Sequence, residues 1–160
     1  MSDILFRTDD YVFSYRVAGV CVRDGFVLLQ NTTSDPGYAF PGGHVAFGET
    51  NEDTLVREFR EEIGADIEVG GLRWVAEVFF PWGNKPCHQI CLYYDIKITS
   101  DNIPREGSFI ASEQLEGRDF NVIYHWIPIG EIEDIELYPP QCKKLLREPD
   151  PRVVHFVYKE

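Results

Sequence analysis

The sequence has no long apolar run and no export signal at its N-terminus. A helix that spans a bilayer needs about 20 consecutive apolar residues, and no stretch of the 160-residue chain approaches this length. The first residues, MSDILFRTDD, lack the basic start and apolar stretch of a secretory signal peptide. These absences predict a cytoplasmic protein without membrane contact.

Positive charge is also scarce. Lysine and arginine total 15 against 27 aspartate and glutamate residues, so the net charge is −12. Nucleic acids and anionic membranes bind basic surfaces, and the sequence shows no basic stripe. Both are therefore excluded as expected partners. A phosphorylated small molecule stays compatible with this charge if a divalent cation lies between ligand and protein.

Cysteines are few and show no disulfide pattern. There are four, at positions 21, 87, 91 and 142, and their scatter agrees with a reducing cytoplasm. The segment CHQIC, residues 87–91, invites a zinc interpretation. In a strand, however, Cys87 and Cys91 share one face while His88 lies on the other. We therefore expect buried thiols that pack as small hydrophobic side chains.

The residues that are present predict one folded domain over 1–160. Apolar residues make up 44% of the chain and aromatic residues 14%, which is enough for a sizeable core. β-branched and aromatic runs predict strands, and Asp24-Gly25 predicts a hairpin turn. The expected strands lie within 11–30 and at 72–82, 88–98, 122–127 and 153–158. Residues 99–119 read as a polar loop with a short helical turn at 112–115.

Two helices complete the predicted α/β fold, in which a curved mixed sheet packs between helices. The second covers about 139–147 and starts at a proline pair. The first covers 51–63, with Thr50 as N-cap, Asp53 completing a capping box and Gly64 at the C-terminal end. At 100° per residue, one sector of this helix collects its apolar side chains. They are Leu55, Val56, Phe59 and Ile63.

The same helix carries a dense group of charges, REFREEIG, at residues 57–64. Like charges at helical neighbour spacing repel each other. Glu58 and Glu62 lie about 40° apart at the border of the apolar sector, and Glu61 lies further round beside Arg57. Two carboxylates at i and i+4 can converge on a divalent cation, which would remove the repulsion. The alternative is a solvated face with surface ion pairs.

The stretch GHVAFGETNEDTLVREFREEIGA, residues 43–65, resembles the Nudix box, GX5EX7REUXEEXGU, in which U is a bulky apolar residue. Every specified position is matched. The matching residues are Gly43, Glu49, Arg57, Glu58, Phe59, Glu61, Glu62, Gly64 and Ala65. The preceding Phe-Pro-Gly at 40–42 is also similar to the family's lead-in to the box. This resemblance implies a Nudix-type α/β/α sandwich.

The resemblance also implies a metal site. Glu58 and Glu62 would be the principal Mg²⁺ ligands, with Glu61 in the same cluster and a backbone carbonyl near Gly43 joining the coordination. Mn²⁺ is the alternative ion. The cofactor expected from the family is therefore one or more divalent cations that water and substrate phosphate complete.

Further residues are expected to support catalysis. By resemblance, Arg57 orients the glutamates, Glu61 takes part in the catalytic cluster, and Glu49 supports the junction between loop and helix. In many family members the general base comes from a loop outside the box. Here the loop at 99–119 offers Glu116 first, with Glu113 and Glu106 as alternatives.

The implied reaction is hydrolysis of a nucleoside diphosphate linked to a group X. Pro81 lies 16 residues after the box, a spacing that resembles a marker of ADP-ribose pyrophosphatases and favours ADP-ribose or a nucleoside-diphosphate sugar. The alternatives are a MutT-like pyrophosphohydrolase of normal or modified nucleoside triphosphates and a non-catalytic nucleotide-binding module. The expected partner is a small nucleotide, and the assembly is left open between monomer and homodimer. Aromatic candidates for base stacking are Tyr38, Phe80, Trp82 and Trp126.

Overall fold

The strands of the molecule form two sheets. The computed structural model describes residues 2–110 and 122–160. Within them, the larger sheet contains β1 (Leu5–Arg7), β2 (Val12–Val20), β5 (Gly42–His44), β6 (Ile67–Trp82), β7 (Lys85–Ile98) and β10 (Val154–Lys159). Its order is β1-β2-β7-β6-β10, with β5 paired to β2. The smaller sheet, of order β3-β4-β9-β8, contains β3 (Val22–Arg23), β4 (Phe26–Thr32), β8 (Ser108–Ile110) and β9 (Val122–Pro128).

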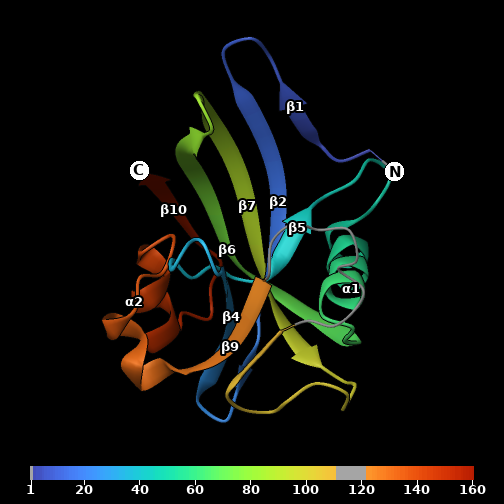
Figure 1. Ribbon diagram of the computed structural model, residues 1–160, viewed down its shortest axis with the longest axis vertical. Helices are drawn as coiled ribbons and strands as arrows, with labels where there is room; N and C mark the ends of the chain where they lie inside the picture. Colours follow the sequence, from blue (N-terminus) through green and yellow to red (C-terminus); the bar gives the residue numbers. More distant parts are fainter. Residues whose placement is uncertain (1, 111–121) are drawn as a thin grey trace.

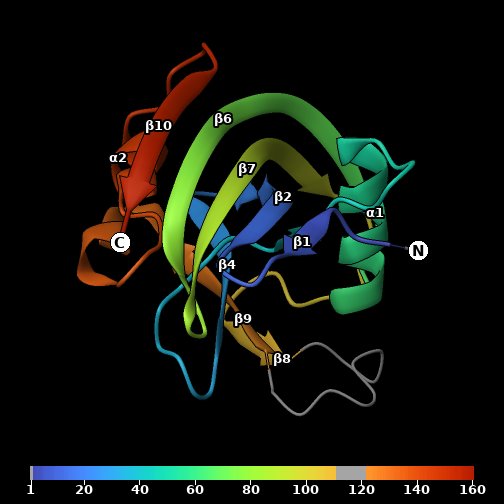
Figure 2. The same cartoon turned by 90° about the horizontal axis from the view of Figure 1, so that it is seen from above.

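Helices lie on both sides of the strands. Figures 1 and 2 show α1 (Asn51–Glu62) and α2 (Gln141–Arg147) on opposite sides of the larger sheet. A 3₁₀ helix, Ile129–Asp134, connects β9 to the segment before α2. The expected α/β/α sandwich is confirmed. In the parts of the chain that the structure describes, neither the length nor the hydropathy of any helix would let it cross a bilayer.

The larger sheet is mixed and strongly curved, as expected. β2 runs parallel to β7, and β10 runs parallel to β6, whereas β6 and β7 form a long antiparallel hairpin. The hairpin bends over β2 like an arch (Figure 2). Its register shifts between Val69 and Trp74, on either side of Leu72. Such irregularities increase local twist and bend, so they help the sheet to curve.

β2 divides the apolar interior into two cores. Successive side chains of a strand point to opposite faces. Val17 accordingly belongs to the core cluster on the α1 side, and Ala18 and Val20 belong to the cluster on the α2 side. The residue between them, Gly19, is closely approached from α1: a Cβ atom there would lie 3.0 Å from the ring of Phe59. The small residue lets the helix pack directly on the strand.

The first helix has the caps and the buried face predicted for it. The Thr50 side chain accepts from the Asp53 backbone N–H, and the Asp53 side chain accepts from the Thr50 N–H. Gly64 follows the helix with a φ of 75°, a left-handed conformation that suits glycine. The predicted apolar face is buried, with exposed fractions of 0% for Leu55, 1% for Phe59 and 5% for Ile63. Val56 is half-buried.

Several elements differ from the prediction. The short strands β1, β5 and β8 and the 3₁₀ helix had no sequence signal, and β6 begins earlier than expected. Residues 11–30 do not form two neighbouring strands, because the chain changes sheet after β2. The turn at Asp24-Gly25 is confirmed with φ angles of 53° and 82°, as a type I′ hairpin requires, but it joins β3 to β4. The helical turn expected at 112–115 lies outside the described residues.

The cysteines behave as hydrophobic packing residues. All four are free thiols and are buried. Cys87 and Cys91 lie on the buried face of β7, and His88 between them is exposed. The interpretation of CHQIC as a strand segment is confirmed.

The pairing of β5 with β2 gives a test of the fold. A Cβ atom at Gly42 would lie 2.0 Å from the backbone oxygen of Val17, whereas one at Gly71 meets no atom within 4 Å. We expect Gly42→Ala to lower the free energy of unfolding by about 1–3 kcal/mol through steric strain. Gly71→Ala should change it by less than about 0.5 kcal/mol. Urea unfolding of both variants measures the difference, and equal stabilities would contradict this account of β5.

Candidate functional site

The site is built where β5 meets α1. β5 pairs with β2 in antiparallel register, with Gly43 opposite Val17. The Glu58 side chain of α1 lies directly against this strand: a Cβ atom at Gly43 would be 2.4 Å from the Glu58 carboxyl carbon. Any larger residue at this position would displace the carboxylate. Gly43 therefore provides the space in which Glu58 is held.

The guanidinium of Arg57 connects three carboxylates. Its Nε and Nη2 donate to the two oxygens of Glu49, each at 2.8 Å. Its Nη1 donates to Glu58 at 2.9 Å and to Glu61 at 3.3 Å. The side chains of Glu49 and Glu58 are each 13% exposed, whereas Glu61 is 59% exposed. The buried pairs are thus bonded closely, and Glu61 lies at the solvent edge.

These contacts shift the ionisation of the group. Hydrogen bonds from Arg57 are the main cause that lowers the pKa of Glu49 to about 2; burial opposes them, and a hydrogen bond from Thr54 adds to them. The hydrogen bond to Glu49 is also the main cause that raises the pKa of Arg57, against the effect of burial. Carboxylate and guanidinium therefore stay ionised at neutral pH.

Glu62 lies in a different electrostatic environment, close to Arg16 of β2. It is half-buried. Burial by itself lowers the pKa of Arg16, but Cys91, Tyr93 and Glu62 raise it, and the net shift is upward. The Arg16 Nη2 donates to the carbonyl oxygen of Phe40 at 2.8 Å. Glu62 thus contributes to the electrostatic surroundings of Arg16, whereas Glu49, Glu58 and Glu61 are bonded to Arg57.

The donor atoms of the site suit a hard cation. Glu58, Glu61, Glu62 and the Gly43 carbonyl offer oxygen ligands only. In the described residues, no group of three or more His, Cys, Asp and Glu side chains is arranged to hold a metal. Mg²⁺ is usually held by one or two carboxylates and keeps several waters or substrate oxygens. The donor chemistry of these carboxylates, with Glu58 held against Gly43, therefore fits such an ion.

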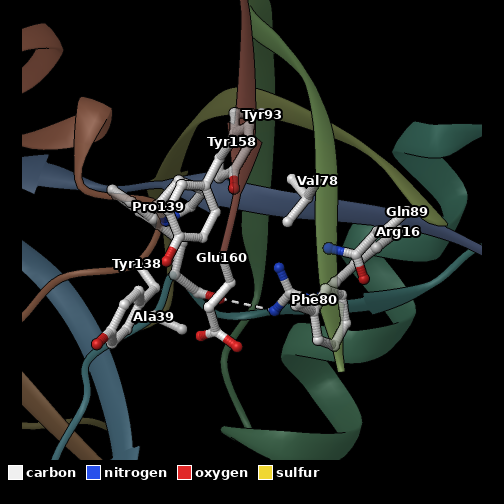
Figure 3. A pocket seen from close by; sticks show the side chains of 11 residues that line it. Arg16, Ala39, Val78, Phe80, Gln89, Tyr93, Tyr138, Pro139, Tyr158 and Glu160 are labelled. Carbon is white, nitrogen blue, oxygen red and sulfur yellow. Dashed lines mark hydrogen bonds between the residues drawn. The ribbon is translucent and has the colours of Figure 1, made fainter. Parts of the chain in front are cut away.

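Arg16 also lines a cavity of about 280 Å³. Figure 3 shows Arg16, Phe80 and Gln89 along one wall and Tyr138 and Tyr158 along the other. The remaining lining residues are Ala39, Phe40, Val78, Tyr93, Pro139 and Glu160. Aromatic walls with few polar groups are typical of sites for planar ligands.

Two of the predicted aromatic residues lie at or beside this cavity. Phe80 lines it. Trp82 is its neighbour, with ring centroids 6.1 Å apart. Trp82 also lies 6.0 Å from the ring of His44, the residue after Gly43, and the Arg7 guanidinium lies 5.7 Å from its ring centroid. The aromatic surface therefore extends from the cavity towards the glycine strand.

The other two aromatic candidates lie elsewhere. Tyr38 is half-buried and packs edge-on against His125 with ring centroids 5.2 Å apart. Trp126 is 4% exposed and belongs to the core on the α1 side. Because its ring is enclosed by protein, Trp126 does not provide a surface for a base, and that expectation is corrected.

Pro81 lies near the end of β6, within the strand expected at 72–82. β6 continues through it to Trp82, and Pro81 lies opposite Pro86 in the hairpin. The hairpin is closed by Gly83-Asn84, where Gly83 has a φ of 62°. The pairing of β10 with β6 ends at Phe79, and that of β2 with β7 begins at Cys87. Both prolines therefore lie beyond the neighbouring strands, where a missing N–H is tolerated.

The predicted general base is not located. Glu116 and the alternative Glu113 lie outside the described residues. Glu106 is exposed in the segment before β8. Sequence reasoning also missed most of the cavity. Arg16 had a signal, a lone charge within the apolar strand VFSYRVAGV, whereas Tyr158 and Glu160 had none, because their place depends on the pairing of β10 with β6.

Comparisons with a family model and with known proteins point to the same family. The family model described as NUDIX domain matches residues 14–148. A Mycobacterium tuberculosis protein provisionally named 8-oxo-dGTP diphosphatase 2 is 44% identical over 61 residues, covering 34% of this chain and 43% of that protein. An ADP-ribose pyrophosphatase of Methanocaldococcus jannaschii is 39% identical over 59 residues, covering 35% of each protein. The chain thus spans less than half the length of these curated relatives.

A solved structure agrees with the fold. The MutT protein from Bacillus halodurans superposes with a TM-score of 0.62 at 17% identity, covering 91% of this chain and 90% of that chain. At this identity the likeness concerns the arrangement of helices and strands.

The Glu49–Arg57 pair predicts a specific pH dependence of stability. The depressed pKa of Glu49 stabilises the fold above the ordinary glutamate pKa, and this contribution is lost as pH falls from about 4.3 towards about 2. Glu49→Gln should therefore lower the free energy of unfolding at pH 7 by about 1–3 kcal/mol, and the difference from wild type should shrink below about pH 4. Urea unfolding across this range measures both.

The matched control is Glu61→Gln, which removes the exposed partner of the same arginine. It should change stability by less than about 0.5 kcal/mol. A Glu49→Gln penalty that does not change with pH would contradict the role of the ion pair.

Proposed function

The chain belongs to the Nudix family, and on this premise we propose that it hydrolyses the pyrophosphate bond of a nucleoside diphosphate linked to a second group, X. The observation that supports this most directly is the junction of three parts. The Glu58 carboxylate of α1 lies against Gly43 of β5, Glu62 raises the pKa of Arg16 through its charge, and Arg16 lines an aromatic cavity. A charged phosphate and a planar base thus find complementary groups side by side.

Glu58 and Glu62 would hold Mg²⁺ or Mn²⁺, together with Glu61 and the Gly43 carbonyl. When bound, the ion supplies neutralisation of phosphoryl charge and a lower pKa for the attacking water. The chain's own contribution is positioning. Arg57 fixes Glu58 and Glu61 by hydrogen bonds, and its positive charge offsets part of their negative charge.

Glu49 holds Arg57 in turn. Its two oxygens accept from Arg57, and one of them also accepts from the buried hydroxyl of Thr54 at 3.0 Å. This fork fixes the guanidinium plane relative to the start of α1. A general base from the loop at 99–119, with Glu116 as first choice, would take the proton of the attacking water.

For the substrate, we favour ADP-ribose or a nucleoside-diphosphate sugar. Phe80, Tyr138 and Tyr158 line a cavity for one planar group. Beyond Phe80, Trp82 with Arg7 and His44 offers a second surface. Two adjoining surfaces suit a molecule with a bulky group at each end of its diphosphate. The relative named ADP-ribose pyrophosphatase agrees with this choice.

The alternative is a nucleoside triphosphate, normal or modified. One base is enough to fill the cavity of about 280 Å³, and another relative carries the name of an 8-oxo-dGTP diphosphatase. A non-catalytic binding module is less favoured, because all box carboxylates are retained.

The first functional test replaces Glu62. Glu62→Gln removes one ligand charge while keeping the side-chain volume. We expect kcat to fall by about two orders of magnitude with an unchanged melting temperature. The matched control is Glu52→Gln in the exposed first turn of the same helix, which should keep wild-type turnover. Near-wild-type kcat in Glu62→Gln would refute the assignment of Glu62.

Substrate choice is tested by kcat/KM at fixed free Mg²⁺. ADP-ribose and nucleoside-diphosphate sugars are compared with normal and oxidised nucleoside triphosphates, and we expect the linked diphosphates to be preferred by about tenfold or more. Trp82→Ala should reduce this preference while retaining activity on triphosphates, because it removes only the second surface. A preference for triphosphates above tenfold would assign the chain to the alternative.

A further inference from the structure

A second cavity, of about 560 Å³, is lined by three cations. It lies where β2 passes into β3, beside the C-terminal end of β7, and it shares no lining residue with the aromatic cavity. Its walls are Cys21, Val22, Arg23, Ile96, Lys97, Ile98, Thr99 and Arg105. Three of the 15 lysines and arginines of a chain with net charge −12 thus line one cavity, and none of the lining residues that the structure describes is acidic. We call it the basic cavity.

Two of the cations are positioned by one buried side chain. The Arg23 guanidinium lies 5.1 Å from the centroid of the Trp126 ring, a cation–π arrangement. The indole N–H of Trp126 donates to the carbonyl oxygen of Pro104 at 2.9 Å, and Arg105 is the next residue. Because Trp126 is 4% exposed and packed in the core, it fixes both Arg23 and the backbone that carries Arg105.

The third cation, Lys97, belongs to β7. Lys97 lies between Ile96 and Ile98, which are 6% and 4% exposed, so its backbone is held by the core. Its cross-strand neighbour is Glu68. Within residues 2–110 and 122–160, none of the three cations forms an ion pair or a side-chain hydrogen bond, with Glu68 or with any other residue.

The three cations, of which Lys97 and Arg105 are exposed, give the cavity a positive surface that favours an anion. Like charges held near one another repel, and the repulsion is relieved by a bound anion. Arginine offers a planar fork that matches phosphate oxygens, and lysine adds a compact charge. We propose that the basic cavity binds a small phosphate-bearing anion, such as pyrophosphate or a mononucleotide, at a site separate from the candidate catalytic centre. The strongly acidic chain disfavours a nucleic acid.

The basic cavity is also connected to α1. Its wall residues Cys21, Ile96 and Ile98 belong to the same core cluster as Phe59 of that helix. The Thr99 backbone N–H donates to the Asp66 carbonyl, just beyond the helix, at 2.9 Å. An anion bound here would therefore rest on the same core that positions the glutamates.

The test is isothermal titration calorimetry of the whole chain with inorganic pyrophosphate in EDTA, so that no divalent cation supports binding at the glutamates. We expect saturable binding to wild type. Arg23→Gln, Lys97→Gln and Arg105→Gln should each weaken it about tenfold, as loss of a charge-assisted hydrogen bond does, and the triple variant should abolish it. In a parallel NMR titration, the largest amide shifts should occur at Val22, Lys97 and Thr99.

The matched control replaces Lys143, Lys144 and Arg147 of α2 by glutamine, which lowers the net charge by the same amount away from the cavity. Melting temperatures identify any variant that fails to fold, and the single variants then decide. Binding that is lost only in the cavity variants supports the proposal. It is overturned by no binding to wild type at about 10 mM pyrophosphate, by unchanged binding in the triple variant, or by equal loss in the control.

Discussion

The bond between Arg57 and Glu49 is the interaction on which the candidate active site depends. One arginine satisfies Glu49 with two hydrogen bonds and still donates to Glu58 and Glu61. Without this cation, carboxylates at helical neighbour spacing would repel each other. With it, Glu49 and Glu58 are held together in a partly buried place. Thr54 donates a hydrogen bond to Glu49, and Gly43 leaves the space that Glu58 occupies.

The larger sheet determines how the Arg57–carboxylate group is placed relative to the aromatic cavity. β2 passes between the two cores and provides Val17 to the side of α1 and Arg16 to the side of the aromatic cavity. Since residues on opposite faces of one strand cannot move independently, the carboxylates of α1 and the aromatic cavity keep a constant relation. The rigid β5–β2 pairing adds to this, because Gly42 and Gly43 leave no room for a shift of the strand.

The two cavities differ in a way that fits different ligands. The first has aromatic walls and a single arginine beside the box carboxylates, so it suits a base attached to a cation-bound diphosphate. The second has three cations and, among the residues described in the structure, no acidic wall residue, so it suits an anion that carries no metal. The aromatic character of Trp126 agreed with base stacking in the sequence. In the structure it is a core residue that positions Arg23 and the backbone before Arg105 at the basic cavity.

Local pattern by itself determined α1, its caps, its buried face, the turn at Asp24-Gly25 and the spacing of the box, because these depend on residues a few positions apart. The α/β class followed from the order of such segments. The tertiary structure alone decided which strands are neighbours, that β2 and β4 enter different sheets, and that β10 brings Tyr158 and Glu160 to Arg16. Strand pairing depends on partners far apart in the chain, and short strands such as β5 exist only because a partner is present. For the same reason the aromatic and basic cavities could not be derived from the sequence: their walls meet only after distant strands have paired.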